Sequence, residues 1–196
     1  MIEWREEAAA PLAKPLDALY AGLAAADVIA IEARLNEAPL VVVASAARQT
    51  VANHLGRVRT EQGGLLAGVP FARDPASAEI DVVLVRAAIA ATDFEGSGVS
   101  LRMESGVWDR ARTALRDGEV VIGWYHSHPG LTAFFSETDR RTQRAFFNHP
   151  FSLGWVVDPL AHEEAWFRSG ESTPVESCQV LALAERDAVA QARSRP

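Results

Sequence analysis

Short apolar runs rich in β-branched residues alternate with segments of helical spacing along most of this 196-residue chain. Such runs, bounded by turn residues, predict strands, whereas apolar residues three and four apart predict helices. Strands are expected at residues 40–47, from residue 63, and at 78–91, 119–128, 152–159 and 163–169. Helices are expected at residues 12–35, 47–58, 108–115, 136–147 and 178–193. Because the two kinds of element are interleaved without a strict βαβ rhythm, we predict an α/β fold with one mixed sheet flanked by helices.

The two ends of the chain are predicted to form helical appendages to this core. Leu16, Leu19 and Leu23 form an apolar stripe on the N-terminal helix, which the core of the same chain, a second copy or a partner has to cover. We therefore divide the chain into an N-terminal helical extension (1–38), a catalytic domain (39–175) and a C-terminal helix or tail (176–196).

Composition excludes several classes of protein. The net charge is −7 and the arginines are scattered, so no nucleic-acid partner is expected. The longest apolar runs fall far below the ~20 residues that a membrane span needs, and the first ten residues do not resemble a secretory signal. A single cysteine, Cys178, forms no intrachain disulfide and is expected to be a small buried apolar group. A cytoplasmic location without membrane contact is therefore expected.

The residues that carry chemistry lie in the segment GWYHSHPGLTAFFSETD. His126 and His128 are two apart at a strand end, so the pleat directs both imidazoles to one face. Asp139 follows in the first turn of the next predicted helix, and a turn at Pro129 could bring it back to the histidines. Two imidazoles and one carboxylate leave a tetrahedral position open, as in catalytic rather than structural zinc sites.

Each part of this pattern also has an ordinary structural interpretation. Ser136 and Asp139 match a helix capping box, and two histidines at a strand end can be surface residues. A glutamate before Gln-Gly-Gly, as at Glu61, commonly marks the end of a helix. The nearby glycines permit close strand packing. The joint pattern, with a Pro-Gly turn between the histidines and the carboxylate, favours a metal site.

The same residues resemble the JAMM motif of the MPN-plus (JAB-type) zinc metalloproteases. The match consists of His126-Ser127-His128-Pro129 and Ser136-Glu137-Thr138-Asp139 at the family's spacing, Glu61 ahead of a glycine-rich strand, and the strand end Val156-Val157-Asp158-Pro159. The resemblance covers roughly residues 39–175 and implies the MPN (cytidine-deaminase-like) sandwich fold. No room exists between Asp139 and Phe151 for the long insertion of linkage-selective eukaryotic members, so a minimal prokaryotic-type, deubiquitinase-like domain is implied.

The resemblance also implies roles for individual residues. His126, His128 and Asp139 would hold one Zn²⁺ with water as the fourth ligand, although such a donor set also binds other divalent ions. Glu61 would act as general base and then general acid. Ser136 would donate a hydrogen bond to the oxyanion. The implied reaction is hydrolysis of the amide bond after the C-terminal tail of a ubiquitin-like modifier.

Substrate and partners follow from the same resemblance. A ubiquitin-like protein or its conjugates would be the substrate, and modifier-activating or conjugating enzymes, including those of bacterial antiviral operons, would be partners. The modifier tail is expected along a sheet edge where Asp93, Glu95 and Glu104 could pair with tail arginines. Phe134 and Phe135, beside the metal, either grip the tail or pack in the core.

Two alternatives of another class remain at this point. The first is a non-catalytic MPN scaffold that assembles partner proteins, but the presence of every expected metal ligand argues against it. The second is a DNA-repair relative of the same fold, but the acidic net charge argues against it. Two further sets of residues are expected to be structural: the histidines without ligand spacing (His54, His149 and His162) and the core tryptophans (Trp108, Trp124, Trp155 and Trp166).

Overall fold

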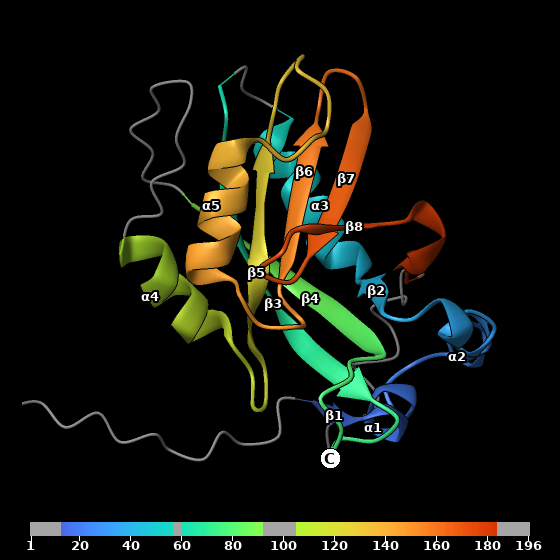
Figure 1. The fold of residues 1–196 in the computed structure, drawn as a ribbon. Coiled ribbons are helices and arrows are strands. Elements are labelled where there is room, and N and C mark those ends of the chain that lie inside the picture. The colour runs from blue at the N-terminus through green and yellow to red at the C-terminus, as the bar shows by residue number, and fades with distance from the viewer. Residues whose placement is uncertain (1–12, 57–59, 92–104, 184–196) are drawn as a thin grey trace, which may run out of the picture.

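The computed structural model describes residues 13–56, 60–91 and 105–183 (Figure 1). Within these residues the strands form one mixed sheet in the order β8-β7-β6-β5-β3-β4-β2-β9, with β1 paired to β3. The strands are β1 (Lys14–Pro15), β2 (Leu40–Val43), β3 (Gly63–Ala72), β4 (Val82–Ala90), β5 (Val120–Ser127), β6 (Leu153–Asp158), β7 (Glu163–Arg168), β8 (Thr173–Val175) and β9 (Val180–Ala182). β5 and β6 run parallel, whereas β3 runs antiparallel to both β4 and β5. The predicted mixed sheet is confirmed.

The helices lie on both faces of the sheet (Figure 1). They are α1 (Leu16–Tyr20), α2 (Ala25–Glu32), α3 (Ser45–Leu55), α4 (Ser105–Ala114) and α5 (Glu137–Phe146), with 3-10 turns η1 (Leu35–Glu37) and η2 (Ser177–Gln179). α3 buries Val51 and Leu55 against one face, whereas α4 buries Val107 and Ala111 in the core of the other. α5, which begins beside Ser136 and carries Asp139, lies on the same face as α4 (Figure 1).

The sheet is strongly curled. Its two edge strands, β8 and β9, are joined by only the residues 176–179, which reach at most about 18 Å when extended. A flat sheet of this strand order would separate the same edges by about 34 Å, at roughly 4.8 Å per strand. The strands therefore wrap around α3, whose apolar side fills the concave face.

Close strand packing explains the glycines of β3. A Cβ atom on Gly64 would meet the carbonyl oxygen of Ile89 on β4, and one on Gly68 would meet the carbonyl oxygen of Leu84. The predicted packing role of these glycines is confirmed. The predicted core tryptophans are also confirmed, because Trp124, Trp155 and Trp166 are buried and Trp108 stacks on Phe147.

Two sequence predictions for the ends of the chain are wrong. The helix expected at 12–35 is divided, because α1 ends at Tyr20 and Ala24 is extended before α2 begins. The helix expected from Cys178 is instead a 3-10 turn and strand β9, which pairs in parallel with β2. Cys178 is exposed in that turn rather than buried. Residues 184–196 lie outside the described part of the chain.

The N-terminal helices are packed in cis. Leu16, Leu19 and Ile31 are buried in one cluster with Phe71 of β3 and Val42 of β2. Among the described residues, no helix combines the length and hydropathy that crossing a bilayer would require.

Candidate metal centre

The two histidines of the motif lie where β5 ends. His126 is the penultimate residue of the strand and pairs with Val156 of β6. His128 lies just beyond the strand and donates its backbone N–H to the carbonyl oxygen of Val157 at 2.9 Å, so its backbone continues the pairing of β5 with β6. Both imidazoles are buried and stand close together, with ring centroids 4.8 Å apart. The strand pairing therefore fixes the two ligands as the sequence predicted.

The carboxylate of Asp139 is brought to the histidines by the start of α5. Ser136 is the N-cap, and its Oγ accepts from the backbone N–H of Asp139 at 3.2 Å. In return, Oδ2 of Asp139 accepts from the backbone N–H of Ser136 at 2.7 Å. This capping box holds the carboxylate so that Oδ1 lies 3.2 Å from Nε2 of His126. The capping box and the metal-site interpretation are both satisfied by the same side chains.

The three side chains lie close enough together to share one ion. Nε2 of His126 lies 3.2 Å from Nε2 of His128 and 3.2 Å from Oδ1 of Asp139, and Oδ2 of Asp139 lies 3.6 Å from Nε2 of His128. Ligand bonds of 2.0–2.2 Å in a tetrahedron around zinc separate neighbouring ligand atoms by about 3.3–3.6 Å. Nε2 of His126 lies equally close to His128 and to Asp139 but carries at most one proton, so a shared cation explains both contacts better than hydrogen bonds alone. The residues present fit a divalent metal ion.

The electrostatics of the site favour the protonation states that bind metal. Burial and the neighbouring His126 lower the pKa of His128, which keeps its imidazole neutral with a free lone pair. Burial would raise the pKa of Asp139, but hydrogen bonds from His126 and Ser136 outweigh it, and the pKa lies below its usual range. The carboxylate is therefore ionised beside a neutral imidazole.

Glu61 reaches the site from a distant part of the sequence. Its Oε1 lies 3.9 Å from Nε2 of His128, and its side chain is partly buried. Burial raises the pKa of Glu61, an effect opposed by His126 and supported by Asp139. The neighbouring residue Gln62 donates its backbone N–H to Oγ of Ser127 at 3.0 Å and accepts the backbone N–H of Ser127 at 2.8 Å. Ser127, the residue between the histidines, thus fixes the main chain that carries Glu61.

The aromatic floor of the site is also fixed by hydrogen bonds. Trp124 stacks on His126 with centroids 4.4 Å apart and an interplanar angle of 8°. Its indole N–H donates to Oε1 of Gln143 at 2.6 Å. The buried amide of Gln143 in turn donates to the carbonyl oxygens of Phe147 and Ser169. No role for Gln143 or Ser127 was predicted, because Trp124, Ser169 and Gln62, with which they form hydrogen bonds, lie 19 to 65 residues away in the chain.

The residues predicted to contact substrate differ in where they lie in the structure. Phe134 is 45% exposed and lies over His128, with centroids 4.9 Å apart. Phe135 is buried and stacks on Phe167 at 4.2 Å, so its side chain belongs to the core and is not available to a substrate. Asp93, Glu95 and Glu104 fall within residues 92–104, which lie outside the described part of the chain.

The remaining histidines are not part of the site. His54 contacts the hydroxyl of Tyr125 through Nδ1 at 2.9 Å on the α3 side of the sheet. His149 stacks on Phe151, and His162 is exposed. Among the described residues, His126, His128 and Asp139 form the one group with metal-ligand convergence.

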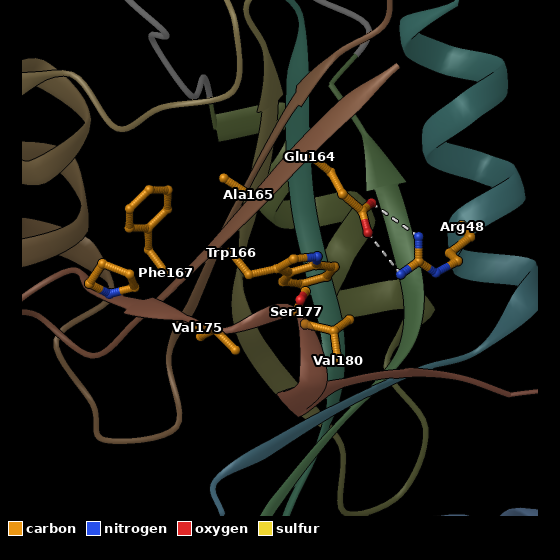
Figure 2. A pocket seen from close by; sticks show the side chains of 9 residues that line it. Arg48, Glu164, Ala165, Trp166, Phe167, Val175, Ser177 and Val180 are labelled. Carbon is orange, nitrogen blue, oxygen red and sulfur yellow. Dashed lines mark hydrogen bonds and ion pairs between the residues drawn. The ribbon is translucent and has the colours of Figure 1, made fainter. Parts of the chain in front are cut away.

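A cavity of about 260 Å³ lies elsewhere, between α3 and the edge of the sheet (Figure 2). Arg48 of α3 and Glu164 of β7 form a two-point ion pair at its rim, at 3.0 and 3.1 Å. Trp166, Val175 and Val180 supply apolar walls. Arg48 and Glu164 also border a neighbouring hollow of about 550 Å³. His126, His128 and Asp139 line neither cavity.

The fold and the three converging ligands define an α/β protein with a candidate metal centre at a strand end. The chain belongs to the family of prokaryotic homologs of the JAB domain, whose model matches residues 43–169. This family assignment confirms the resemblance seen in the sequence.

Individual relatives match over shorter segments. The chain is 37% identical over 71 residues to "Ubiquitin carboxyl-terminal hydrolase RPN11" of Saccharomyces cerevisiae, which is 33% of this chain and 23% of that protein. It is 32% identical over 84 residues to "NAD(+) hydrolase TcpA" of a Theionarchaea archaeon, which is 42% of this chain and 23% of that protein. The match thus spans less than a quarter of either relative.

The fold has a counterpart among solved structures. The solution structure of protein DSY2949 from Desulfitobacterium hafniense superposes with a TM-score of 0.56 at 19% identity, over 76% of this chain and 96% of that one. At this identity the likeness concerns the fold alone.

Proposed function

We propose that this protein is a zinc-dependent peptidase or isopeptidase that hydrolyses the amide bond after the C-terminal tail of a ubiquitin-like modifier. The observation that carries the proposal is the convergence of two imidazoles and one carboxylate at 3.2–3.6 Å, with the carboxylate of Glu61 3.9 Å from His128. The yeast relative is named as a ubiquitin carboxyl-terminal hydrolase, which supports the class of substrate. The archaeal relative is named as an NAD(+) hydrolase, but two imidazoles and one carboxylate beside Glu61 suit metal-assisted amide hydrolysis, so that activity is not proposed for this chain.

His126, His128 and Asp139 are the residues that would hold the ion, and zinc suits a four-coordinate hydrolytic site best. When bound, zinc supplies Lewis-acid polarisation and makes water acidic enough to give up a proton near neutral pH.

Glu61 moves the proton in the proposed reaction. It accepts a proton from the attacking water as the C–O bond forms, and returns that proton to the amine nitrogen as the C–N bond breaks. A carboxylate suits this exchange when burial raises its pKa towards neutrality, which is the direction found for Glu61. The contacts of Ser127 with Gln62 hold the main chain beside Glu61 in place.

Ser136 stabilises the charge that develops on the carbonyl oxygen. Its Oγ accepts from the backbone of Asp139, so the hydroxyl proton remains free to point towards a substrate. A hydrogen bond that forms only as charge develops lowers the barrier rather than the Michaelis constant.

Phe134 is proposed as a contact for the modifier tail, because it is an exposed aromatic side chain beside His128. Asp93 and Glu95 remain proposed partners for tail arginines. We expect Phe134→Ala to raise the Michaelis constant for a modifier fusion about 10-fold, the order of one lost hydrophobic contact, with little change in kcat. Steady-state kinetics test this, and an unchanged Michaelis constant would exclude the contact.

Metal content per chain tests the site directly. Mass spectrometry of the purified wild type, His128→Ala and the exposed control His162→Ala should give about one zinc for the wild type and control and none for His128→Ala. Circular dichroism shows that each variant is folded. A folded wild type that takes up no zinc would contradict the proposal and favour the non-catalytic scaffold.

Cleavage of a modifier fusion tests the reaction. We expect Glu61→Gln to keep its zinc and lose about 10²–10⁴-fold in kcat, since a positioned general base contributes that much. Glu163→Gln, which changes an exposed carboxylate of β7, should leave kcat unchanged. If a zinc-loaded wild type cleaves no modifier fusion, the proposed substrate class is wrong even though the metal site stands.

A further inference from the structure

The last residue of β6, Asp158, is fully buried yet makes no ion pair among the described residues. Its carboxylate instead accepts hydrogen bonds from four backbone N–H groups. Gly130 and Thr132 donate to it at 2.9 Å each, from the loop that follows His128. Leu160 and Ala161 donate at 2.9 and 3.1 Å, from the turn that follows Asp158 itself. One side chain therefore ties the metal-site loop to the end of the neighbouring strand.

The loop that Asp158 holds has an unfavourable conformation. Thr132 has φ 71° and Gly130 has φ 76°, both in the left-handed region. A β-branched residue such as threonine rarely adopts this region, and such strain persists only where the surroundings enforce it. The hydrogen bond from the Thr132 N–H to Asp158 is a contact that enforces it.

The same loop determines how His128 faces the site. The backbone N–H of Leu131 donates to the carbonyl oxygen of His128 at 3.1 Å, which closes the turn. Nδ1 of His128 is buried and has no hydrogen-bond partner among the described residues. The backbone of Thr132 raises the pKa of this imidazole, against the larger lowering by burial. Metal-bound histidines normally donate their second ring N–H to a carbonyl or carboxylate, which fixes the ring and its tautomer. Because the turn that begins at His128 is held at Thr132 by Asp158, a backbone carbonyl of this loop would take that proton, and we assign it to Thr132.

We propose that Asp158 is a positioning residue of the metal centre, which holds the main chain of Gly130 and Thr132 so that the Thr132 carbonyl orients the His128 imidazole. This inference rests on the proposed function, because it assumes that His128 binds a metal ion. Asp158 touches neither metal nor substrate and acts only through the loop. In the sequence, Asp158 belongs to the strand end that resembles the family, but no role was predicted for it.

The test is the zinc affinity of Asp158→Asn, measured by competition with a chromogenic chelator. Asparagine keeps the size of the side chain but places an NH₂ group against one of the backbone N–H donors, so the loop loses at least one bond. Asp81→Asn is the matched control, because Asp81 is also a buried carboxylate that accepts a backbone N–H, from Arg73 at 2.7 Å, but it contacts no part of the metal site.

Substitution of a residue that orients a metal ligand typically weakens metal affinity 10–100-fold. We expect a loss of that order for Asp158→Asn and less than about twofold for Asp81→Asn. The visible spectrum of the cobalt-substituted protein should also change only in Asp158→Asn, since it reports ligand geometry. Unchanged affinity and an unchanged spectrum in a folded Asp158→Asn would overturn the inference. A wild type that binds no zinc would instead contradict the proposed function.

A rescue experiment separates positioning from mere stability. Thr132→Gly removes the strain of the left-handed threonine while keeping its N–H and carbonyl, so the loop should depend less on Asp158. We expect Thr132→Gly to restore about tenfold of the zinc affinity lost in Asp158→Asn, and no restoration would count against the inference. Should Asp158→Asn fail to fold, nitrogen-15 spectra of the zinc-loaded wild type decide: a slowly exchanging, hydrogen-bonded Nδ1 proton on His128 is expected, and its absence would overturn the inference.

Discussion

At the scale of single residues, Ser136 has two functions that a pair of substitutions can separate. It caps α5, and its hydroxyl is proposed to donate to the oxyanion. Ser136→Ala should lower the free energy of unfolding by about 1 kcal/mol, whereas Ser136→Gly, which keeps a favourable N-cap backbone, should lower it by only a few tenths. Both variants lose the hydroxyl, so we expect the same loss of about 10²–10³-fold in kcat from both.

Urea denaturation of the two variants measures the loss of stability, and steady-state kinetics measure the loss of kcat. If the loss of kcat follows the loss of stability, with Ser136→Gly close to the wild type, Ser136 acts only as a helix cap. Equal losses of kcat at unequal stabilities would support the proposed donor.

A second residue-scale prediction concerns pH. Backbone N–H groups, first that of Gly130, lower the pKa of Asp158 to about 2, whereas an aspartate in an unfolded chain titrates near ~3.9. Because the folded pKa is the lower one, the stabilisation is complete above about pH 5 and is lost as the pH falls towards 2. Urea denaturation with a chelator present should therefore show a larger difference between the wild type and Asp158→Asn at about pH 6 than at about pH 2.5. An equal difference at both pH values would show that the charge of Asp158 does not contribute.

The metal ligands were accessible to sequence reasoning because they are close in the chain. His126, His128 and Asp139 lie on one strand end and one helix start, whose geometry follows from the periodicity of each element. Ser127 and Asp158 were not accessible as functional residues, because their partners are 65 and 26–28 residues away. Only the folded sheet brings those partners together.

At the scale of elements, the contact between β5 and α5 depends on Gln143. This fully buried amide accepts from Trp124 and donates to two backbone carbonyls, so Gln143→Leu would leave three buried polar groups without partners. Each such group costs about 1–3 kcal/mol, and we expect a total loss of about 3 kcal/mol or more in urea denaturation. The control Gln49→Leu, on the exposed side of α3, should change stability by less than about 0.5 kcal/mol. Equal effects of the two substitutions would contradict this account.

The central elements could be predicted because their periodicity agrees with their burial. β4, β5, β6, β7 and helices α3, α4 and α5 all lie where apolar patterning placed them. The ends of the chain could not be predicted in the same way. Residues 180–182 form a short apolar run that suits a helix or an edge strand equally, and pairing with β2 selects the strand. The break between α1 and α2 contains Gly22, directly after the C-cap residue Ala21, and this helix-ending glycine was outweighed in the prediction by the spacing of the leucines.

At the scale of the whole molecule, the N-terminal segment completes the fold rather than extending from it. The sequence left open whether its apolar stripe is covered by the same chain, by a second copy or by a partner. In the structure, Leu16, Leu19 and Ile31 share a cluster with residues of β2, β3, β4 and β9, which form one half of the sheet. Deletion of residues 1–36 would therefore expose apolar strand surface, and we expect a lower melting temperature together with light scattering from aggregates.

Two isoleucines of α2 provide the sharper test, because they are two residues apart on opposite sides of one helix. Ile31 is 1% exposed and Ile29 is 69% exposed. Truncation of a buried isoleucine to alanine costs about 2–5 kcal/mol, whereas an exposed truncation changes stability by less than about 0.5 kcal/mol. For a chain of this size, about 1 kcal/mol corresponds to 2–4 °C in Tm, so Ile31→Ala should melt at least about 4 °C below the wild type and Ile29→Ala within about 2 °C of it. If light scattering instead shows that Ile29→Ala dissociates an oligomer while Ile31→Ala melts like the wild type, the helix is covered in trans and the cis packing is wrong.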